Sequence, residues 1–123
     1  MYRTGLSARL TSTHHLAGGS PEESVDHAHD YLVEVTVAGA EVDAKGYLVD
    51  IDLLRSALIA ALRRYEGRCL NELPEFRSMA PSLENLSREI YDQLRPMLAA
   101  GRSLEVRVWE DQEAWAGYEG PKG

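Results

Sequence analysis

The stretch HAHDYLVEVTV, residues 27–37, decides the fold of this chain. From His27 to Val37 every second residue is a histidine, a tyrosine or a valine, whereas Glu34 and Thr36 occupy intervening positions. Side chains alternate between the two faces of a β-strand, so this pattern predicts a strand with one apolar face. Such a strand is typical of an antiparallel sheet that is covered on one side only.

Three further stretches are expected to belong to the same sheet. Residues 1–14 alternate in the same way, with Leu10 and His14 among the apolar-phase positions, and residues 104–109 and 114–119 read as two closing strands. Residues 15–26, between the first two strands, are rich in glycine, serine, proline and acids, which is the composition of a loop.

A hairpin is also expected after the central strand. Residues 39–46 contain several turn residues, and residues 47–49 are apolar enough to form a short returning strand.

Two helices are expected between the second strand and the closing strands. Asp50 is suited to cap the first, whose apolar residues recur at helical spacing to about residue 65. The second should begin near Ser82, and Pro96 should kink or shorten its last turn. The order of elements predicts a single α+β domain over residues 1–123, an antiparallel sheet with two helices packed on one face.

Composition excludes several classes of function. Hydrophobic residues make up 44% of the chain and charged residues 27%, with a formal net charge of −7, which argues against a nucleic-acid partner. No apolar run approaches the roughly 18 residues of a membrane helix. The acidic charge favours a small-molecule substrate instead. The one cysteine, Cys69, cannot form an internal disulfide, so we expect a cytoplasmic protein.

Three histidines share the apolar phase of the predicted strands. His27 and His29 lie two residues apart on one strand, and His14 is in phase with the apolar residues of another. Buried imidazoles need a partner for each nitrogen, and three histidines with one open position are typical of a catalytic zinc. The alternative is an ordinary hydrogen-bonded core histidine at each position. If the register slips by one residue, His15 exchanges roles with His14.

The order of short motifs resembles a known family. These motifs are THHL at 13–16, HAH at 27–29, GYLVDIDLL at 46–54, CLNELP at 69–74, APSLENL at 80–86 and VWE at 108–110. Together they resemble the 6-pyruvoyl-tetrahydropterin synthases and, equally, the 6-carboxytetrahydropterin synthases of queuosine biosynthesis. The resemblance implies a pterin substrate, a zinc ion and the tunnelling fold, in which sheets of several copies form an oligomeric barrel, usually a hexamer.

The resemblance also implies roles for individual residues. His14, His27 and His29 match the family's zinc ligands. Glu110 matches the acid that anchors the pterin, and a carboxylate can accept two parallel hydrogen bonds from the pterin's amino-pyrimidine edge. Glu110 is in phase with Leu104, Val106 and Val108, so we expect it to face inward.

Two residues near the second helix match a family segment that lies near the pterin. These are Ser82 and Glu84. A helix N-cap followed by an acid in the first turn explains them nearly as well.

The chain departs from the family at its catalytic groups. Glu23 stands where the family has a cysteine, and Glu66 and Gly67 stand where it has an Asp-His pair; glycine cannot relay a proton. A glutamate in the cysteine position is associated with cleavage of the dihydroneopterin side chain, so Glu23 is either a general base or a solvated loop acid. Cys69 is either a substitute thiol or a packing residue.

Three functions remain open at this point. The first is a zinc-dependent lyase or synthase acting on a dihydroneopterin-type substrate, with Glu23 and Glu66 as candidate catalytic residues and 6-carboxytetrahydropterin synthesis as one variant. The second is a non-catalytic pterin-binding paralogue. The third is a structural zinc protein with no ligand site.

Overall fold

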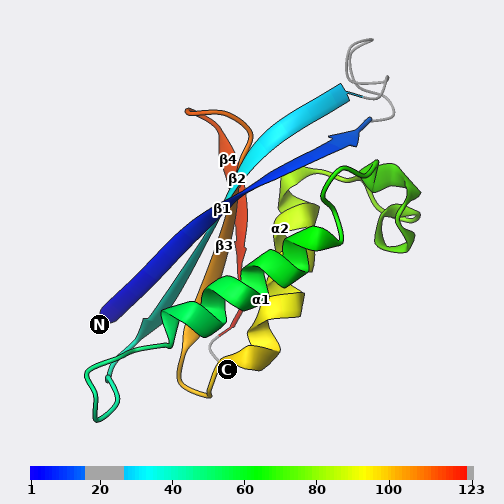
Figure 1. The fold of residues 1–123 in the computed structure, drawn as a ribbon. Helices are drawn as coiled ribbons and strands as arrows, with labels where there is room; N and C mark the ends of the chain where they lie inside the picture. The colour runs from blue at the N-terminus through cyan, green and yellow to red at the C-terminus, as the bar shows by residue number, and fades with distance from the viewer. Residues whose placement is uncertain (16–26, 122–123) are drawn as a thin grey trace.

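A four-stranded antiparallel sheet forms one layer of the molecule, and two helices form the other (Figure 1). The computed structural model describes residues 1–15 and 27–121, with His27 described for its backbone only. The strands are β1 (Tyr2–His14), β2 (His27–Gly39), β3 (Ser103–Trp109) and β4 (Trp115–Glu119), in the order β1-β2-β3-β4. The four strands predicted for the sheet and the α+β class are confirmed.

The long pairing of β1 with β2 sets the positions of the chemically interesting side chains. Its register runs from Tyr2 opposite Gly39 to His14 opposite His27, with Ser12 opposite His29. Residues on alternate positions share a face of the sheet. The three predicted histidine positions therefore lie together at one end of the β1-β2 pair, which Figure 1 shows at upper right.

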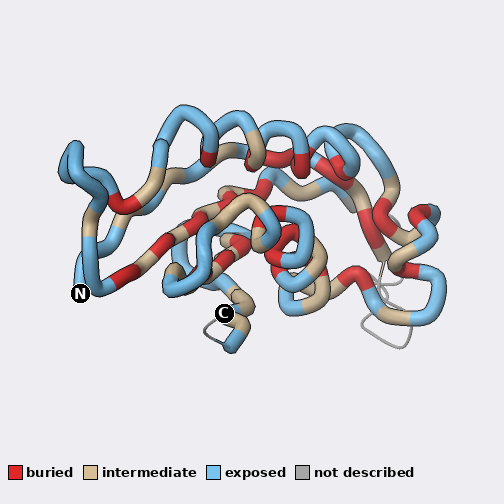
Figure 2. Tube along the Cα trace, turned by 90° about the horizontal axis from the view of Figure 1, so that it is seen from below, coloured by how far each residue is buried: buried red, intermediate tan, exposed pale blue. Residues whose placement is uncertain are grey.

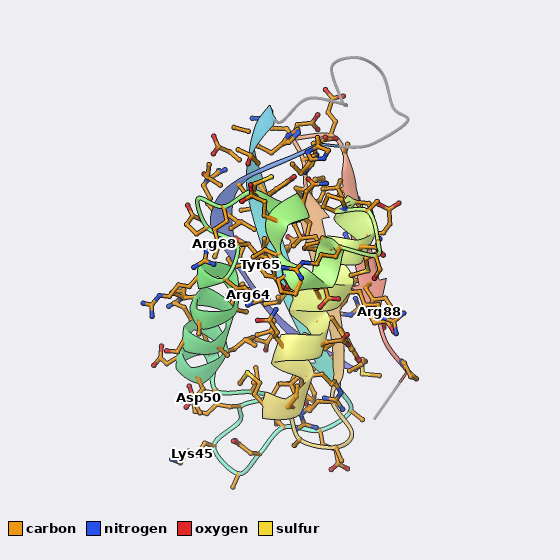
Figure 3. The ribbon with its side chains drawn as sticks, turned by 90° about the vertical axis from the view of Figure 1, so that its right-hand side faces the viewer. Lys45, Asp50, Arg64, Tyr65, Arg68 and Arg88 are labelled. Carbon is orange, nitrogen blue, oxygen red and sulfur yellow. The ribbon has the colours of Figure 1, made fainter. Side chains whose placement is uncertain are left out.

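The helices α1 (Ile51–Arg63) and α2 (Leu83–Leu94) cover the same face of the sheet, as Figures 1 and 3 show. The buried stretches of the sheet face those of the helices across the layer between them (Figure 2). Burial of apolar side chains there is the main stabilising contribution, at roughly 25 cal/mol per Å². Members of this core include Val33, Val35, Val37, Leu54, Leu58, Leu62, Leu86, Ile90, Leu94, Val106 and Val108.

Both helices begin at the residues that the sequence indicates. Asp50 accepts hydrogen bonds from the backbone N–H groups of Asp52 and Leu53, which satisfies donors that a helix start leaves open. Ser82 caps α2 through the N–H of Asn85. The α2 helix stops at Leu94, and a 3₁₀ turn containing Pro96 follows it, so proline shortens this helix as expected.

The hairpin expected over residues 39–49 is wrong. Residues 47–49 form no strand. Asp43 folds the segment on itself, because its carboxylate accepts from the N–H groups of Lys45 and Tyr47 at 2.9 Å each. The carbonyl of Leu48 accepts instead from the Arg102 side chain at 3.0 Å, so Leu48 packs into the core without joining the sheet, while Tyr47 stays exposed.

The segment between the helices is tied to both of them. It contains two 3₁₀ turns, Leu70–Glu72 and Pro74–Phe76. The guanidinium of Arg64 donates two hydrogen bonds to Glu75, and the buried Tyr65 hydroxyl accepts from Gln93 of α2 at 2.6 Å. Figure 3 labels Arg64 and Tyr65 near the end of α1.

The same segment covers part of the outer edge of β1. The N–H of Gly67 donates to the carbonyl of Thr11 at 2.7 Å, and the N–H of Thr13 donates to the carbonyl of Arg68 at 3.0 Å. The carboxylate of Glu66 accepts from the N–H of Thr11 at 3.0 Å. The end of β1 that carries His14 is thereby held between β2 and this segment.

Neither α1 nor α2 is long and apolar enough to cross a membrane, and no other helix within residues 1–15 and 27–121 is either.

Candidate functional site

Two histidine rings and a tyrosine ring stack at the end of the β1-β2 pair. The ring centroids of His14 and His29 are 4.9 Å apart, and those of His29 and Tyr31 are 5.4 Å apart. His14 is 5% exposed, and 20% of the His29 side chain is accessible. The predicted inward phase of these two histidines therefore matches their burial, and Nε2 of His29 is itself buried although part of the ring is accessible.

Tyr31 makes a direct contact with the first histidine. Its hydroxyl lies 2.8 Å from Nδ1 of His14, within a buried environment. Burial raises the pKa of the Tyr31 phenol far above its ordinary value, the negative charge of Glu110 adds to this rise, and the Ser12 hydroxyl partly opposes it. The phenol therefore stays protonated at neutral pH.

Glu110 brings a carboxylate to the same corner of the sheet. It follows β3 directly, and its backbone N–H donates to the carbonyl of Ala114 at 2.9 Å, which closes the turn into β4. Its Oε1 lies 3.9 Å from Nε2 of His29, too far for a hydrogen bond, and 42% of the side chain is exposed. The carboxylate thus stands beside the His29 ring and is open to solvent.

The arrangement of His14 and His29 is compatible with one shared cation. Two imidazoles that bind the same zinc through Nε2 at about 2.0–2.1 Å have ring centroids roughly 5 Å apart, close to the separation seen here. Tyr31 occupies Nδ1 of His14, so Nε2 is the nitrogen on the side away from that contact. The donor chemistry therefore fits zinc.

The third predicted ligand lies at the limit of what the structure describes. The backbone of His27 is directly opposite His14 in the sheet register. Among the side chains that the structure describes, no three histidine, cysteine, aspartate or glutamate groups converge to hold a metal. The side chain of His27 is not among them, and neither is Glu23. The three-histidine site and the role of Glu23 stay predictions.

Comparison with known proteins identifies the family. The sequence model described as 6-pyruvoyl tetrahydropterin synthase matches residues 6–121, nearly the whole chain. The chain belongs to the 6-pyruvoyl tetrahydropterin synthase family. A 6-carboxy-5,6,7,8-tetrahydropterin synthase of Bacillus subtilis is 30% identical over 79% of this chain and 70% of its own. A 6-pyruvoyl tetrahydrobiopterin synthase of Dictyostelium discoideum is 31% identical over 76% of this chain and 70% of its own.

Solved structures of synthases share the fold of this family member. The 6-pyruvoyl tetrahydropterin synthase of Caenorhabditis elegans superposes with a TM-score of 0.82 at 20% identity, covering 98% of this chain and 96% of its own. That of Plasmodium vivax, solved as a variant in which a glutamate described as a catalytic residue is replaced by alanine, has a TM-score of 0.72 at 14% identity. It covers 98% of this chain and 99% of its own.

Glu66, Gly67 and Cys69 lie against the outer edge of β1. The Glu66 side chain is bound to the edge of β1 at Thr11. Gly67 has a φ of 69°, in the left-handed region that favours glycine, and its N–H is also bound to β1. Cys69 pairs with Thr13 as an isolated parallel bridge. These residues close the strand edge, and the catalytic role predicted for Glu66 stays a prediction.

The residues near the start of α2 have the local contacts of a helix N-terminus. Ser82 caps the helix, and Glu84 is exposed in its first turn, so the capping interpretation accounts for both. An open hollow of about 310 Å³ nevertheless separates this segment from the histidine end of β1. Its lining residues are His15, Asn71, Arg77, Ser78, Met79, Ala80 and Pro81.

Two features of the site were missed in the sequence. Tyr31 lies two residues after His29 and so on the same face of the strand, which was the only sign of its role. The alternation by itself indicates no more than a core residue. Asn71 holds the backbone of His15 through two hydrogen bonds of 2.9 and 3.1 Å, and only the fold brings these distant residues together.

Proposed function

We propose that this chain is a zinc-dependent, pterin-binding enzyme that cleaves the side chain of a dihydroneopterin-type substrate. One observation carries the proposal: the rings of His14 and His29 meet at one corner of the sheet, and the carboxylate of Glu110 stands 3.9 Å from His29. Membership of the synthase family supports the pterin, and the names of the relatives support an enzyme.

His14, His27 and His29 would hold the zinc ion. A zinc ion with three histidine ligands and one open position supplies Lewis-acid polarisation of a substrate oxygen. The exposed carboxylate of Glu110, 3.9 Å from Nε2 of His29, supports a site that opens to an incoming ligand, whereas a structural zinc is normally closed by a fourth protein ligand.

Glu110 would orient the pterin. The amino-pyrimidine edge presents a ring N–H and an exocyclic amine in parallel, and a carboxylate is the side chain that accepts both. The exposed position of Glu110 beside the rings supports this role, because the substrate's side chain would then extend toward the histidines.

Glu23 would act as the general base. In the proposed cleavage, the base takes the proton of the hydroxyl on the second side-chain carbon, and the bond between the first and second carbons breaks. The second carbon leaves within glycolaldehyde, and the first carbon takes up a proton to give 6-hydroxymethyl-dihydropterin. No oxidant or reductant is needed. The glutamate described as catalytic in the Plasmodium vivax synthase supports a carboxylate in this family's chemistry.

Glu66 is left out of the proposed chemistry. Its carboxylate is held by the N–H of Thr11, which lies three residues before His14 and so about 10 Å from it along the strand. With glycine at the neighbouring position, this pair has no imidazole to move a proton. Cleavage needs fewer proton transfers than 6-pyruvoyl formation, which favours it here.

A second candidate is 6-carboxytetrahydropterin synthesis. The 30% identical Bacillus subtilis relative carries that name, which is the observation in its favour. A non-catalytic pterin-binding protein is the remaining alternative, because two of the family's usual catalytic groups are replaced.

Product analysis separates these functions. Zinc-loaded protein is incubated with dihydroneopterin and, separately, with its triphosphate, and the products are resolved by mass. We expect 6-hydroxymethyl-dihydropterin, lost after Glu23→Gln substitution and after zinc removal. A 6-carboxy product would favour the second candidate, and ligand binding without turnover would favour the third. Formation of the 6-pyruvoyl product at about 1 per second or faster would contradict the proposed chemistry.

A further inference from the structure

The hydroxyl of Tyr31 reaches across the sheet to the ring of His14. In the register of β1 and β2, Tyr31 lies opposite Leu10, and Ser12 separates Leu10 from His14 on the same face. The tyrosine therefore leans diagonally over Ser12, whose small side chain leaves room for it. The resulting contact of 2.8 Å joins two residues that are almost fully buried.

The direction of this hydrogen bond is linked to which nitrogen of His14 can bind a cation. A neutral imidazole carries one proton, so either Nδ1 or Nε2 is a donor and the other offers a lone pair. If Nδ1 donates to the phenol oxygen, Nε2 presents its lone pair. If the phenol donates to Nδ1 instead, Nε2 carries the proton and cannot bind a metal.

We propose that Tyr31 is a positioning residue for the zinc site, which accepts the Nδ1 proton of His14 and holds the ring with Nε2 directed at the metal. This inference rests on the proposed function, because it assigns Tyr31 a task only if zinc binds. A ligand histidine generally gives its second ring proton to such a partner, which fixes both the tautomer and the orientation of the ring.

Ser12 offers a place for the phenol's own proton. A phenol that accepts from His14 still has that proton to donate. The Ser12 hydroxyl, 1% exposed, makes no hydrogen bond among the described residues, so its oxygen can accept one. The hydrogen bond with Tyr31 is thus one contact that orients the ring of His14.

The test compares Tyr31→Phe with a matched control, Tyr65→Phe. Tyr65 is also fully buried, and its hydroxyl also makes a side-chain hydrogen bond, but to Gln93 in the helical layer. Both substitutions keep the ring and remove one buried hydroxyl. Zinc affinity is measured by competition with a chromogenic chelator, and the folded state of each metal-free variant is checked by circular dichroism and thermal unfolding.

We expect Tyr31→Phe to bind zinc about 10- to 100-fold more weakly than the unaltered chain, and Tyr65→Phe to bind it within about twofold. The visible spectrum of the cobalt-loaded protein should change only for Tyr31→Phe, because only that variant alters the surroundings of a ligand. Equal zinc affinity in Tyr31→Phe and the unaltered chain would overturn the inference alone. Failure of the unaltered chain to bind zinc would overturn the proposed function with it.

Discussion

The carboxylate of Glu110 could serve either as an ion-pair partner of His29 or as a binding group for a ligand. Its Oε1 is 3.9 Å from Nε2 of His29, and nearly half of its side chain is accessible. A carboxylate committed to an imidazole would lie about 1 Å closer. The 3.9 Å separation therefore favours a ligand-binding role for Glu110 over a role in stabilising the fold.

The substitution Glu110→Gln tests this interpretation at the level of one residue. The amide presents a donor where the pterin edge also presents a donor, so pterin affinity should fall by roughly 2–4 kcal/mol. Zinc content should not change, because Glu110 is not a proposed ligand. Affinity is measured by fluorescence titration with a pterin, and zinc by elemental analysis.

The control for this prediction is Glu113→Gln. Glu113 lies in the same turn and is exposed, so its substitution changes the charge equally without touching the site. Pterin affinity that is unchanged in Glu110→Gln, or reduced equally in both variants, would remove Glu110 from the site.

At the level of elements, the segment between α1 and α2 depends on an ion pair for its attachment. Arg64 holds the pKa of the Glu75 carboxyl below its usual value, mainly through its hydrogen bonds. A carboxyl with a lowered pKa in the folded state stabilises the protein above its unfolded-state pKa near 4.5, and this contribution is lost as the pH falls through the folded-state value.

We therefore expect Glu75→Gln to lower the free energy of unfolding at pH 7 by about 1 kcal/mol, with Arg64 partly exposed to solvent. The difference from the unaltered chain should shrink as the pH falls below about 4.5. Urea unfolding at several pH values measures it. The exposed Glu72→Gln serves as control, and a Glu75→Gln difference that persists undiminished at pH 3 would contradict the assignment.

Strands and helices with a regular spacing of apolar residues could be predicted from the sequence. Segments whose conformation depends on a single side chain could not. The strands follow from the two-residue alternation, and α2 follows from the cap at Ser82 and the proline after Leu94. The hairpin prediction over 39–49 failed because one carboxylate, Asp43, gives the backbone an alternative to a strand ladder.

The candidate site likewise has one part that the sequence predicts and another part that it does not. The shared face of His14 and His29 could be predicted, because each histidine alternates in step with the apolar residues of its own strand. The contact of Tyr31 with His14 depends on the register between two strands, and the contact of Glu66 with Thr11 joins residues far apart in the chain. Neither register nor such contacts can be read from a single strand.

At the scale of the whole molecule, the sheet leaves part of an edge open. Backbone groups of Thr11 and Thr13 on the outer edge of β1 are bound by the segment after α1. For the rest of that edge, from Tyr2 to Arg9, the described residues offer no backbone partner. Open edges are commonly closed by another copy of the chain, so we propose the homo-oligomer, a hexamer, that the family's barrel implies.

A proline on this edge tests the assembly. The N–H groups of Thr11 and Thr13 point away from β2. Backbone groups alternate in direction along a strand, so the N–H of Ser7, an even number of residues away, also points outward. Ser7→Pro should leave the pairing with β2 intact and weaken association. Light scattering should give about six times 13.7 kDa for the unaltered chain and a smaller mass for Ser7→Pro. A monomeric unaltered chain would contradict the proposed assembly.

In the proposed site, three histidines on one face of the sheet bind zinc, and metal analysis of purified protein tests this most directly. We predict about one zinc per chain, no zinc after joint substitution of His27→Ala and His29→Ala, and unchanged zinc in His15→Ala, whose backbone is held by Asn71. Circular dichroism should show that each variant is folded. Stoichiometric zinc in the double variant, or none in the unaltered chain, would contradict the three-histidine zinc site.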